Sequence, residues 1–285
     1  MAKTQDIKRR IRSISNTMQL TRAMKMVSAA KLRRAQDRIL AARPYAHRTL
    51  NVLRSLAARA NPELHPLLQV HGDKRVEMVV ITADKGLCGA FNSHIIRTAE
   101  SFAGEMGGRE LSVAAVGKKA REYFGRRAYT MNREWTDIFR RVEFSHAVDI
   151  AQTIMDLYVG KQLDEIYLVY NEFKSAIQAR PVVQRLLPVE PESFREGETA
   201  EDYIYEPNPH ALLEALLPHY VKHLVYQALI ESAAAEHAAR MTAMDSATNN
   251  AGELIESLTL TMNRVRQASI TTEIIEVVSG AEALA

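Results

Sequence analysis

The residues of this sequence whose types could support catalysis are concentrated in one turn. Asp84-Lys85-Gly86-Leu87-Cys88-Gly89-Ala90-Phe91-Asn92 is the only glycine-rich turn that follows a predicted strand. It has neither the G-x-x-x-x-G-K-[ST] phosphate cradle nor the G-x-G-x-x-G dinucleotide fingerprint. Cys88 could act as a nucleophile, but no obvious base is near, and His94 lies along the helix that should follow. We interpret the segment as a structural turn that leads into a helix.

A second candidate site is a pair of histidines on one face of a predicted helix. His219 and His223 are four residues apart and could grip zinc, but no H-E-x-x-H motif surrounds them and no third ligand is evident. Cys88 is the only cysteine, which excludes an internal disulfide and any multi-cysteine zinc site. No G-x-S-x-G elbow is present. The sequence therefore predicts a protein that is not an enzyme by itself, with no cofactor and no metal.

The charge of the chain is distributed unevenly. Residues 1–59 carry fifteen Lys or Arg and two Asp, a balance of +13, whereas the rest carries 22 basic and 32 acidic side chains, a balance of −10. A helix whose charges served only to keep it soluble would carry both acidic and basic side chains, because these form stabilising i,i+4 pairs. The pattern favours a cationic rod with an acidic partner, either a polyanion or an acidic protein surface.

Glycine placement predicts the elements that carry these residues. Ten of the twelve glycines lie between Gly72 and Gly197, and glycine costs about 1 kcal/mol in a helix interior. Two long helices are expected, the first with a local kink at Pro44 and the second starting near Pro209. Apolar or small residues recur at 3.5-residue spacing in both, as in a coiled-coil seam. The predicted seam positions are Ile11, Ile14, Met18, Thr21, Lys25, Ser28, Leu32, Ala35 and Ile39, then Leu254, Leu258, Thr261, Val265, Ala268, Thr272 and Ile275.

Short apolar runs between the two helices predict a sheet. They span residues 76–82, 111–116, 166–170 and 182–187, with helical patterns at 93–106 and 147–159. This alternation predicts an α/β domain with a largely parallel sheet. We therefore expect a central Rossmann-like α/β domain at 75–195 and an antiparallel coiled coil between a helix at 1–60 and a longer helix at 209–285.

Three separated stretches resemble one family, the gamma subunit of rotary proton-translocating ATP synthases. The strongest is ITTEIIEVVSGAEA at 270–283, which fits the family's carboxyl-terminal signature. The run ISNTMQLTRAMKMV at 14–27 and the turn DKGLCGAFN at 84–92 are also similar to that family, as are residues 238–251 and 263–274. The three matches occur in the family's order, and the resemblance covers essentially the whole chain.

The resemblance implies a non-catalytic central rotor shaft that couples c-ring rotation to ATP synthesis or hydrolysis in a ring of three alpha and three beta subunits, and that regulates ATPase activity and proton flow. It implies an epsilon subunit beside the domain and a peripheral place on the cytoplasmic face of the bacterial inner membrane. It also implies contact residues in three sets. Acidic beta-subunit loops would contact Met24, Lys25, Lys85 and Cys88. The catch loop and the bearing formed by the alpha and beta subunits would contact Arg264, Arg266, Gln267, Ile270, Ile274, Val277 and Val278. At the foot, the c-ring and epsilon subunit would contact Tyr203, Tyr205 and Glu206.

Three other function classes remain as alternatives. A +13 helix could bind nucleic-acid phosphates, but Tyr45 is the only aromatic residue before Phe91, so no base-stacking platform accompanies the charge. A scaffold with a coiled-coil arm would not explain the apolar end after Ala268. A nucleotide-binding enzyme would need the phosphate motif that the turn lacks. No apolar stretch approaches the ~20 residues that a membrane span requires, and the amino terminus lacks the apolar core of a secretory signal, so a soluble, intracellular protein is expected.

Overall fold

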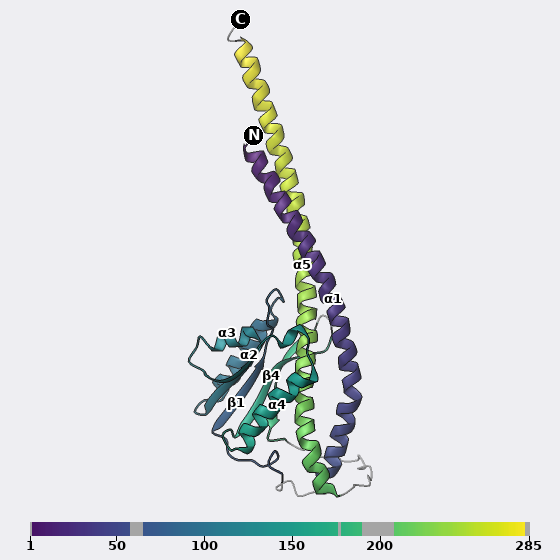
Figure 1. The fold of residues 1–285 in the computed structure, drawn as a ribbon. Helices are drawn as coiled ribbons and strands as arrows, with labels where there is room; N and C mark the ends of the chain where they lie inside the picture. Colours follow the sequence, from purple (N-terminus) through teal and green to yellow (C-terminus); the bar gives the residue numbers. More distant parts are fainter. Residues whose placement is uncertain (1, 58–64, 176–177, 190–207, 283–285) are drawn as a thin grey trace. The chain divides into compact units, whose positions relative to one another are not determined.

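The computed structural model describes residues 2–57, 65–175, 178–189 and 208–282. It divides into two compact units. The terminal unit joins Met1–Ala29 to Arg240–Ala285, and the central unit is Ala30–Ala239. The long helices α1 (Ala2–Ala57) and α5 (Pro209–Glu282) each contribute to both units. The predicted combination of an α/β domain with antiparallel terminal helices is confirmed (Figure 1). The predicted three-segment boundaries stay a prediction.

Both long helices are continuous through a proline. Pro44 lies inside α1 and Pro218 inside α5. A proline removes one helical hydrogen bond and costs about 3 kcal/mol in a helix interior, so the neighbouring turns must compensate. The end expected for the first helix, at residue 60, lies outside the described residues.

The terminal unit is an antiparallel helix pair with a partly polar seam. On α1, Thr21 and Ser28 are buried and Ile11, Ile14 and Met18 are half-buried, as the spacing predicts. On α5 the predicted seam is right at Leu258 and Val265 and wrong by one residue at Leu254, Thr261 and Ala268, while the predicted positions Thr272 and Ile275 are exposed. The shielded positions are Met244, Thr248, Ala251, Ile255, Leu258, Met262, Val265 and Ser269, whereas Leu254 is exposed. Adjacent apolar residues fit a 3.5-residue spacing equally well, so the pattern alone could not choose between Leu254 and Ile255.

The sheet of the central unit has five strands in the order β3-β2-β1-β4-β5. β1 (Arg75–Ile81) pairs in parallel with β2 (Glu110–Val116) and β4 (Glu165–Phe173), and β2 pairs in parallel with β3 (Thr130–Trp135). β5 (Ala179–Leu187) is antiparallel to β4. The connecting helices are α2 (Phe91–Glu105), α3 (Lys118–Phe124) and α4 (Phe144–Val159). A single 3-10 turn, Ile138–Arg140, precedes α4.

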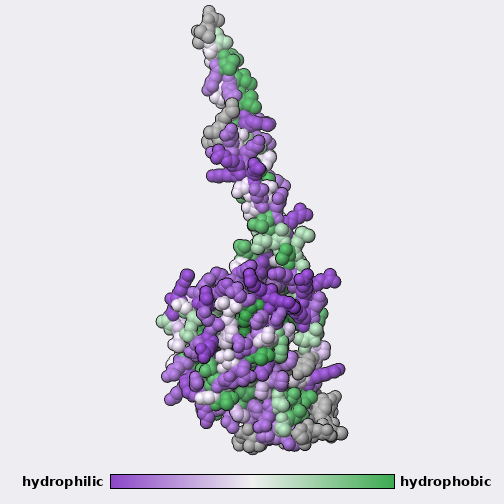
Figure 2. Space-filling model, in the orientation of Figure 1, coloured by the Kyte–Doolittle hydropathy of each residue, from purple (hydrophilic) through white to green (hydrophobic). Residues whose placement is uncertain are grey.

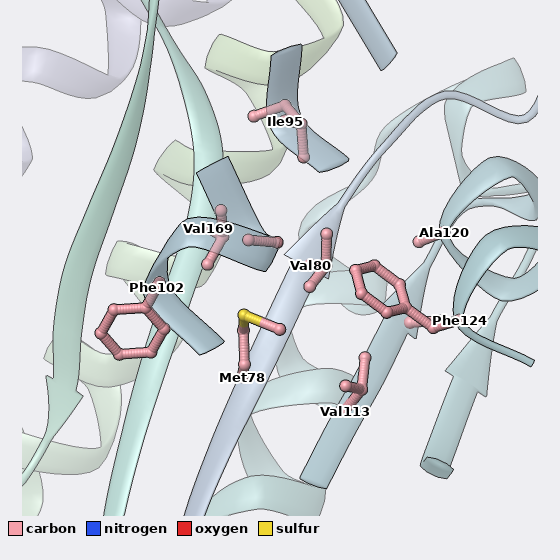
Figure 3. Close-up of a cluster of buried hydrophobic side chains, with 10 residues drawn as sticks. Met78, Val80, Ile95, Phe102, Val113, Ala120, Phe124 and Val169 are labelled. Atoms are coloured by element: carbon pink, nitrogen blue, oxygen red, sulfur yellow. The ribbon is translucent and has the colours of Figure 1, made fainter. Parts of the chain in front are cut away.

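One face of the sheet forms an apolar core with α2 and α3. Met78 and Val80 of β1 point toward Ile95 and Phe102 of α2 and toward Phe124 of α3 (Figure 3). All five side chains are buried. α5 packs on the sheet as well, because the Asn171 backbone N–H donates to Ser232 Oγ at 3.3 Å. Residues 228–238 of α5 are all buried, as expected of a helix enclosed on every side.

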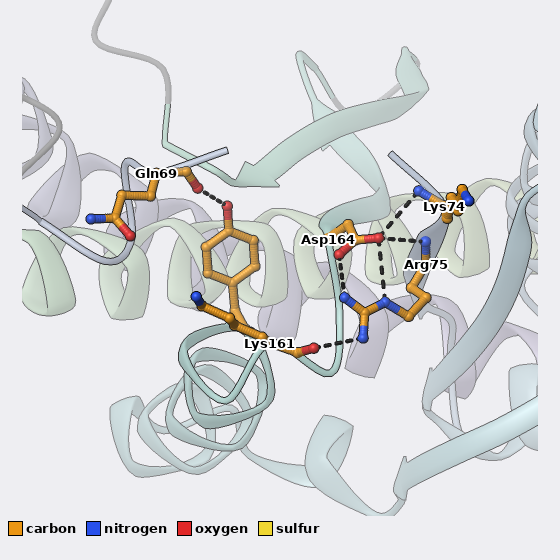
Figure 4. Close-up of polar contacts among 6 residues, drawn as sticks. Gln69, Lys74, Arg75, Lys161 and Asp164 are labelled. Carbon is orange, nitrogen blue, oxygen red and sulfur yellow. Dashed lines mark hydrogen bonds and ion pairs between the residues drawn. The ribbon is translucent and has the colours of Figure 1, made fainter. Parts of the chain in front are cut away.

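A buried carboxylate joins the starts of β1 and β4. Asp164 accepts hydrogen bonds from the Lys74 and Arg75 backbone N–H groups, at 3.2 and 2.9 Å (Figure 4). The Arg75 guanidinium binds the same carboxylate, with Nη2 2.6 Å from Oδ1. The hydrogen bond from Arg75 is the main cause that holds the pKa of Asp164 below its ordinary value. Nearby, the Tyr158 hydroxyl donates to the Gln69 carbonyl at 2.5 Å.

Candidate functional site

The glycine-rich turn after β1 is built around Cys88. The thiol is buried, and Asn92 Nδ2 lies 3.2 Å from its Sγ. Asn92 Oδ1 accepts from the Ala83 backbone N–H at 3.0 Å, which ties the start of α2 to the end of β1. Lys85 is exposed on the same turn. Of the two turn residues predicted to meet a partner, Lys85 therefore presents its charge to solvent, while Cys88 supports the turn from inside.

The backbone N–H groups beside this turn are bound by side chains of the chain itself. Asp84 Oδ1 accepts from the Lys118 and Asp137 N–H groups at 3.1 and 3.0 Å, and Oδ2 accepts from Phe139 N–H at 3.2 Å. Thr82 Oγ1 accepts from Ala120 N–H at 2.8 Å. These are the groups at the carboxyl edge of a parallel sheet that often bind phosphate in α/β folds. Here they fasten α3 and the segment before α4 to the end of β1.

The α1 segment of the terminal unit carries two of the residues predicted to meet a partner. Met24 and Lys25 are half-buried on α1. Lys25 Nζ lies 2.5 Å from Asp245 Oδ1 of α5, and both side chains remain more than 40% exposed. Thr21 Oγ1 and Thr248 Oγ1 lie 2.8 Å apart in the seam beside them. The ammonium group of Lys25 thus forms an ion pair within the chain and remains accessible to solvent.

The end of α5 exposes a group of large apolar side chains. Ile270, Ile274, Ile275, Val277 and Val278 are each between 48% and 73% exposed, and we call them the apolar end. Figure 2 shows hydrophobic residues gathered along this part of the helix. Every residue from 270 to 281 is exposed, because α5 continues beyond the start of α1 (Figure 1). Contiguous apolar patches on a soluble surface mark interaction sites.

The structure describes the predicted catch and bearing residues but not the predicted foot residues. Arg264, Arg266 and Gln267 are exposed on α5 before the apolar end. Tyr203, Tyr205 and Glu206 lie outside the described residues, so the predicted foot contact stays a prediction. The set predicted to meet the beta-subunit loops is therefore divided, with Met24 and Lys25 in the terminal unit and Lys85 and Cys88 in the central unit. The catch and bearing residues of α5 all lie in the terminal unit.

Of the two histidines considered for zinc, His219 is exposed and His223 is half-buried against α4. The rings of His223 and Phe144, the first residue of α4, have centroids 4.9 Å apart. Burial, reinforced by nearby His219, lowers the pKa of His223. Among the described residues, no group of three or more His, Cys, Asp or Glu is arranged to hold a metal ion. None of the described helices is long and apolar enough to cross a membrane.

Sequence reasoning missed a group of basic residues that the fold assembles. Arg140 and Arg141, in the segment between β3 and α4, lie beside Lys31, Arg34 and Arg38 of α1. These residues are about a hundred positions apart, and no spacing rule connects them. The local signals were the adjacent pair Arg140-Arg141 and the basic composition of the first helix, and neither indicates that the two meet.

Comparisons with known proteins agree over the whole chain. A family model described as ATP synthase matches residues 3–284. The chain is 51% identical over 282 residues to the ATP synthase gamma chain of Solibacter usitatus, with 98% of each chain covered. It is 47% identical to the gamma chain of Pelotomaculum thermopropionicum, with both chains fully covered.

Solved structures show the same architecture. The structure of the Tetrahymena thermophila mitochondrial ATP synthase central stalk and c-ring contains a chain that is 27% identical, with a TM-score of 0.61 over 80% of this chain and 99% of that one. A chain of the Euglena gracilis mitochondrial ATP synthase, 20% identical, shows the same fold with a TM-score of 0.69 over 99% of this chain and 95% of that one. The chain therefore belongs to the ATP synthase gamma-chain family, the non-catalytic central-stalk subunits of that complex.

Proposed function

We propose that this chain is the shaft that transmits torque between a rotating c-ring and a ring of three alpha and three beta subunits, and that it thereby regulates ATP turnover and proton flow. The apolar end of α5 is the observation that carries this proposal. Five large aliphatic side chains exposed on a free helix need an apolar environment, and a sleeve of alpha and beta subunits would supply it without directional contacts. Weakly directional contacts allow a helix to turn.

Reconstitution with alpha and beta subunits tests the proposal. ATPase turnover should depend on this chain, and a bead attached to the α/β domain should rotate during hydrolysis. An active complex in which the bead does not rotate would refute the role. The variant Ile274→Asp should weaken assembly with the ring or its turnover, because a carboxylate would enter the sleeve. Glu273→Asp, next to it on the same exposed helix, is the matched control and should leave both unchanged.

We further propose that acidic loops of successive beta subunits contact Met24, Lys25 and Lys85, with Cys88 holding the second contact in place. The exposed charge of Lys85 and the accessible charge of Lys25 support this contact. Attraction shared among three beta subunits can couple rotation to domain closure without fixing one angle. Replacing Met24 with lysine should impair the coupling of hydrolysis to proton pumping more than it impairs assembly. Unchanged coupling in that variant would contradict the contact.

The remaining partners follow from the same role. We propose that Tyr203, Tyr205 and Glu206 meet the c-ring, with an epsilon subunit alongside, and that the chain lies on the cytoplasmic face of the bacterial inner membrane as a peripheral protein. Aromatic residues beside a carboxylate suit a polar, partly hydrated protein contact. Crosslinking from cysteines placed at 203 and 205 in the assembled complex should give products with c and epsilon subunits. Crosslinks to neither would overturn the foot assignment.

A further inference from the structure

The central unit contains a cavity of about 440 Å³ with a strongly basic lining, which we call the basic cavity. Its cations come from two elements that are far apart in the sequence. They are Lys31, Arg34 and Arg38 of α1 and Arg140 and Arg141 of the segment that follows β3. None of the eleven residues that line it carries a carboxylate. A hollow lined by charges of one sign concentrates ligands of the opposite sign.

Few cations of the basic cavity form an ion pair with a carboxylate among the described residues. Within the described part of the chain, Arg141 is the one of the five that forms an ion pair, with its Nε 3.2 Å from Glu143 Oε1. Like charges held close together repel, and a bound anion would remove that repulsion. Guanidinium groups also present paired donors that match the oxygens of a phosphate. The chemistry of the lining therefore favours a phosphate-bearing ligand.

The wall that carries Arg140 and Arg141 is fastened at both of its ends. Asp84 Oδ2 accepts from the Phe139 N–H at 3.2 Å, which fixes the wall to the turn after β1. On the other side, Arg38 Nη1 donates to the Val142 carbonyl at 3.0 Å, which fixes it to α1. Because the backbone of this wall is already fixed, a ligand that binds there has less chain to order.

The apolar part of the lining indicates a ligand larger than a single phosphate. Phe139, Ile230 and Ala233 are buried and border the basic cavity beside its cations. The volume lies within the roughly 300–1,000 Å³ typical of small-molecule sites. We propose that the basic cavity binds a diphosphate, either inorganic pyrophosphate or the diphosphate of a nucleotide, with Arg34 and Arg140 as its principal cations. This ligand is additional to any nucleotide that the catalytic subunits of the complex hold.

Calorimetric titration of the full chain tests the assignment with three probes: pyrophosphate, ADP and adenosine. We expect pyrophosphate and ADP to bind one per chain and adenosine not to bind. ADP that binds at least tenfold more tightly than pyrophosphate identifies the nucleotide as the source, and equal affinities identify the inorganic ion. Absence of binding by both diphosphates at millimolar concentration would overturn the proposal. Because no alpha or beta subunit is present, this result is independent of the rotor experiments.

Neighbouring arginines on α1 offer a matched pair of variants. Arg34 lines the basic cavity, whereas Arg33 does not and is exposed on the same helix. Arg34→Ala should weaken diphosphate binding about 10- to 100-fold, as expected for loss of a charge-assisted contact. Arg33→Ala should change it less than twofold, and circular dichroism should show both variants folded. Equal losses in the two variants would mean that general charge attracts the ligand. Arg34-dependent binding of a poly-glutamate peptide without diphosphate binding would assign the basic cavity to an acidic protein segment and refute the proposal.

Discussion

Substitution of Gly117 by alanine should strongly destabilise the central unit. Gly117 lies between β2 and α3 with a φ of 95°, a conformation that a residue with a Cβ rarely adopts. A Cβ built there would lie 2.2 Å from the Thr82 carbonyl oxygen and 2.8 Å from its carbon. Both are backbone atoms of Thr82, the residue that follows β1, so neither can rotate away as a side chain would. The whole junction would have to move by about an ångström.

The cost of Gly117→Ala has two parts. With a ψ of 148°, this positive-φ conformation is essentially restricted to glycine, and holding a residue with a Cβ in it adds roughly 1–3 kcal/mol. Forcing extra volume into a packed site adds about 1–3 kcal/mol. The displaced backbone would also strain the hydrogen bond from Gly117 N–H to the Trp135 carbonyl, now 2.7 Å, and that from Thr82 N–H to the Val116 carbonyl, now 2.8 Å. We therefore expect a loss of about 3–5 kcal/mol in the free energy of unfolding.

Urea denaturation followed by fluorescence measures this loss directly. Trp135 is the only tryptophan of the chain and lies at this junction, so its emission reports the central unit. A loss of that size should lower the midpoint by roughly 1–2 M urea. Gly104→Ala is the control, because Gly104 lies in α2 with nothing within 4 Å of the added Cβ, and it should be neutral or stabilising. A midpoint for Gly117→Ala within about 0.3 M of the parent would refute the steric reasoning.

Three further outcomes follow from the charged groups. Burial raises the pKa of Glu77 above its ordinary value of 4.5, so ionisation of this side chain destabilises the fold as the pH rises above 4.5. Glu77→Gln should therefore be more stable than the parent by about 1–3 kcal/mol at pH 7. In urea denaturation at pH 4 this gain should vanish. The pKa of Asp164 is lowered, so its contribution is present above its ordinary value of 3.8 and is lost as pH falls through the lower folded value. Asp164→Asn should be clearly less stable at pH 6, and equal melting temperatures at pH 6 would contradict this. The pair of Lys25 and Asp245 is half exposed, so a double-mutant cycle on thermal unfolding should give a coupling below about 1 kcal/mol, and a larger value would show that the seam depends on it.

The sequence predicts the fold well where its patterns are local. Long segments without glycine correspond to α1 and α5, and the four apolar runs correspond to β1, β2, β4 and β5. β3 was missed because it is an edge strand with the mixed sequence TMNREW, whose side chains are mostly exposed. α3 was missed because seven residues are too few to show a helical period.

The candidate site was predictable to different degrees in its parts. The exposed apolar end followed from a helix with few charges, and family resemblance located the arginines and Gln267 before it. The basic cavity was not predictable, because it depends on α1 and the segment after β3 meeting in the folded chain. The ion pair of Lys25 with Asp245 could not be predicted either, since a charged residue at a seam position does not reveal its partner.

The pairing of α1 with α5 also constrains how the protein is made. Thr21 and Thr248, which meet in the seam, are 227 residues apart, and Lys25 and Asp245 are 220 apart. The first 29 residues leave the ribosome long before their partner segment is synthesised. Closing so long a loop is slow unless the intervening α/β domain folds first and brings the two ends together. The nascent amino-terminal helix should therefore remain sensitive to protease until the last residues are released, and become protected in the same step as the end of synthesis.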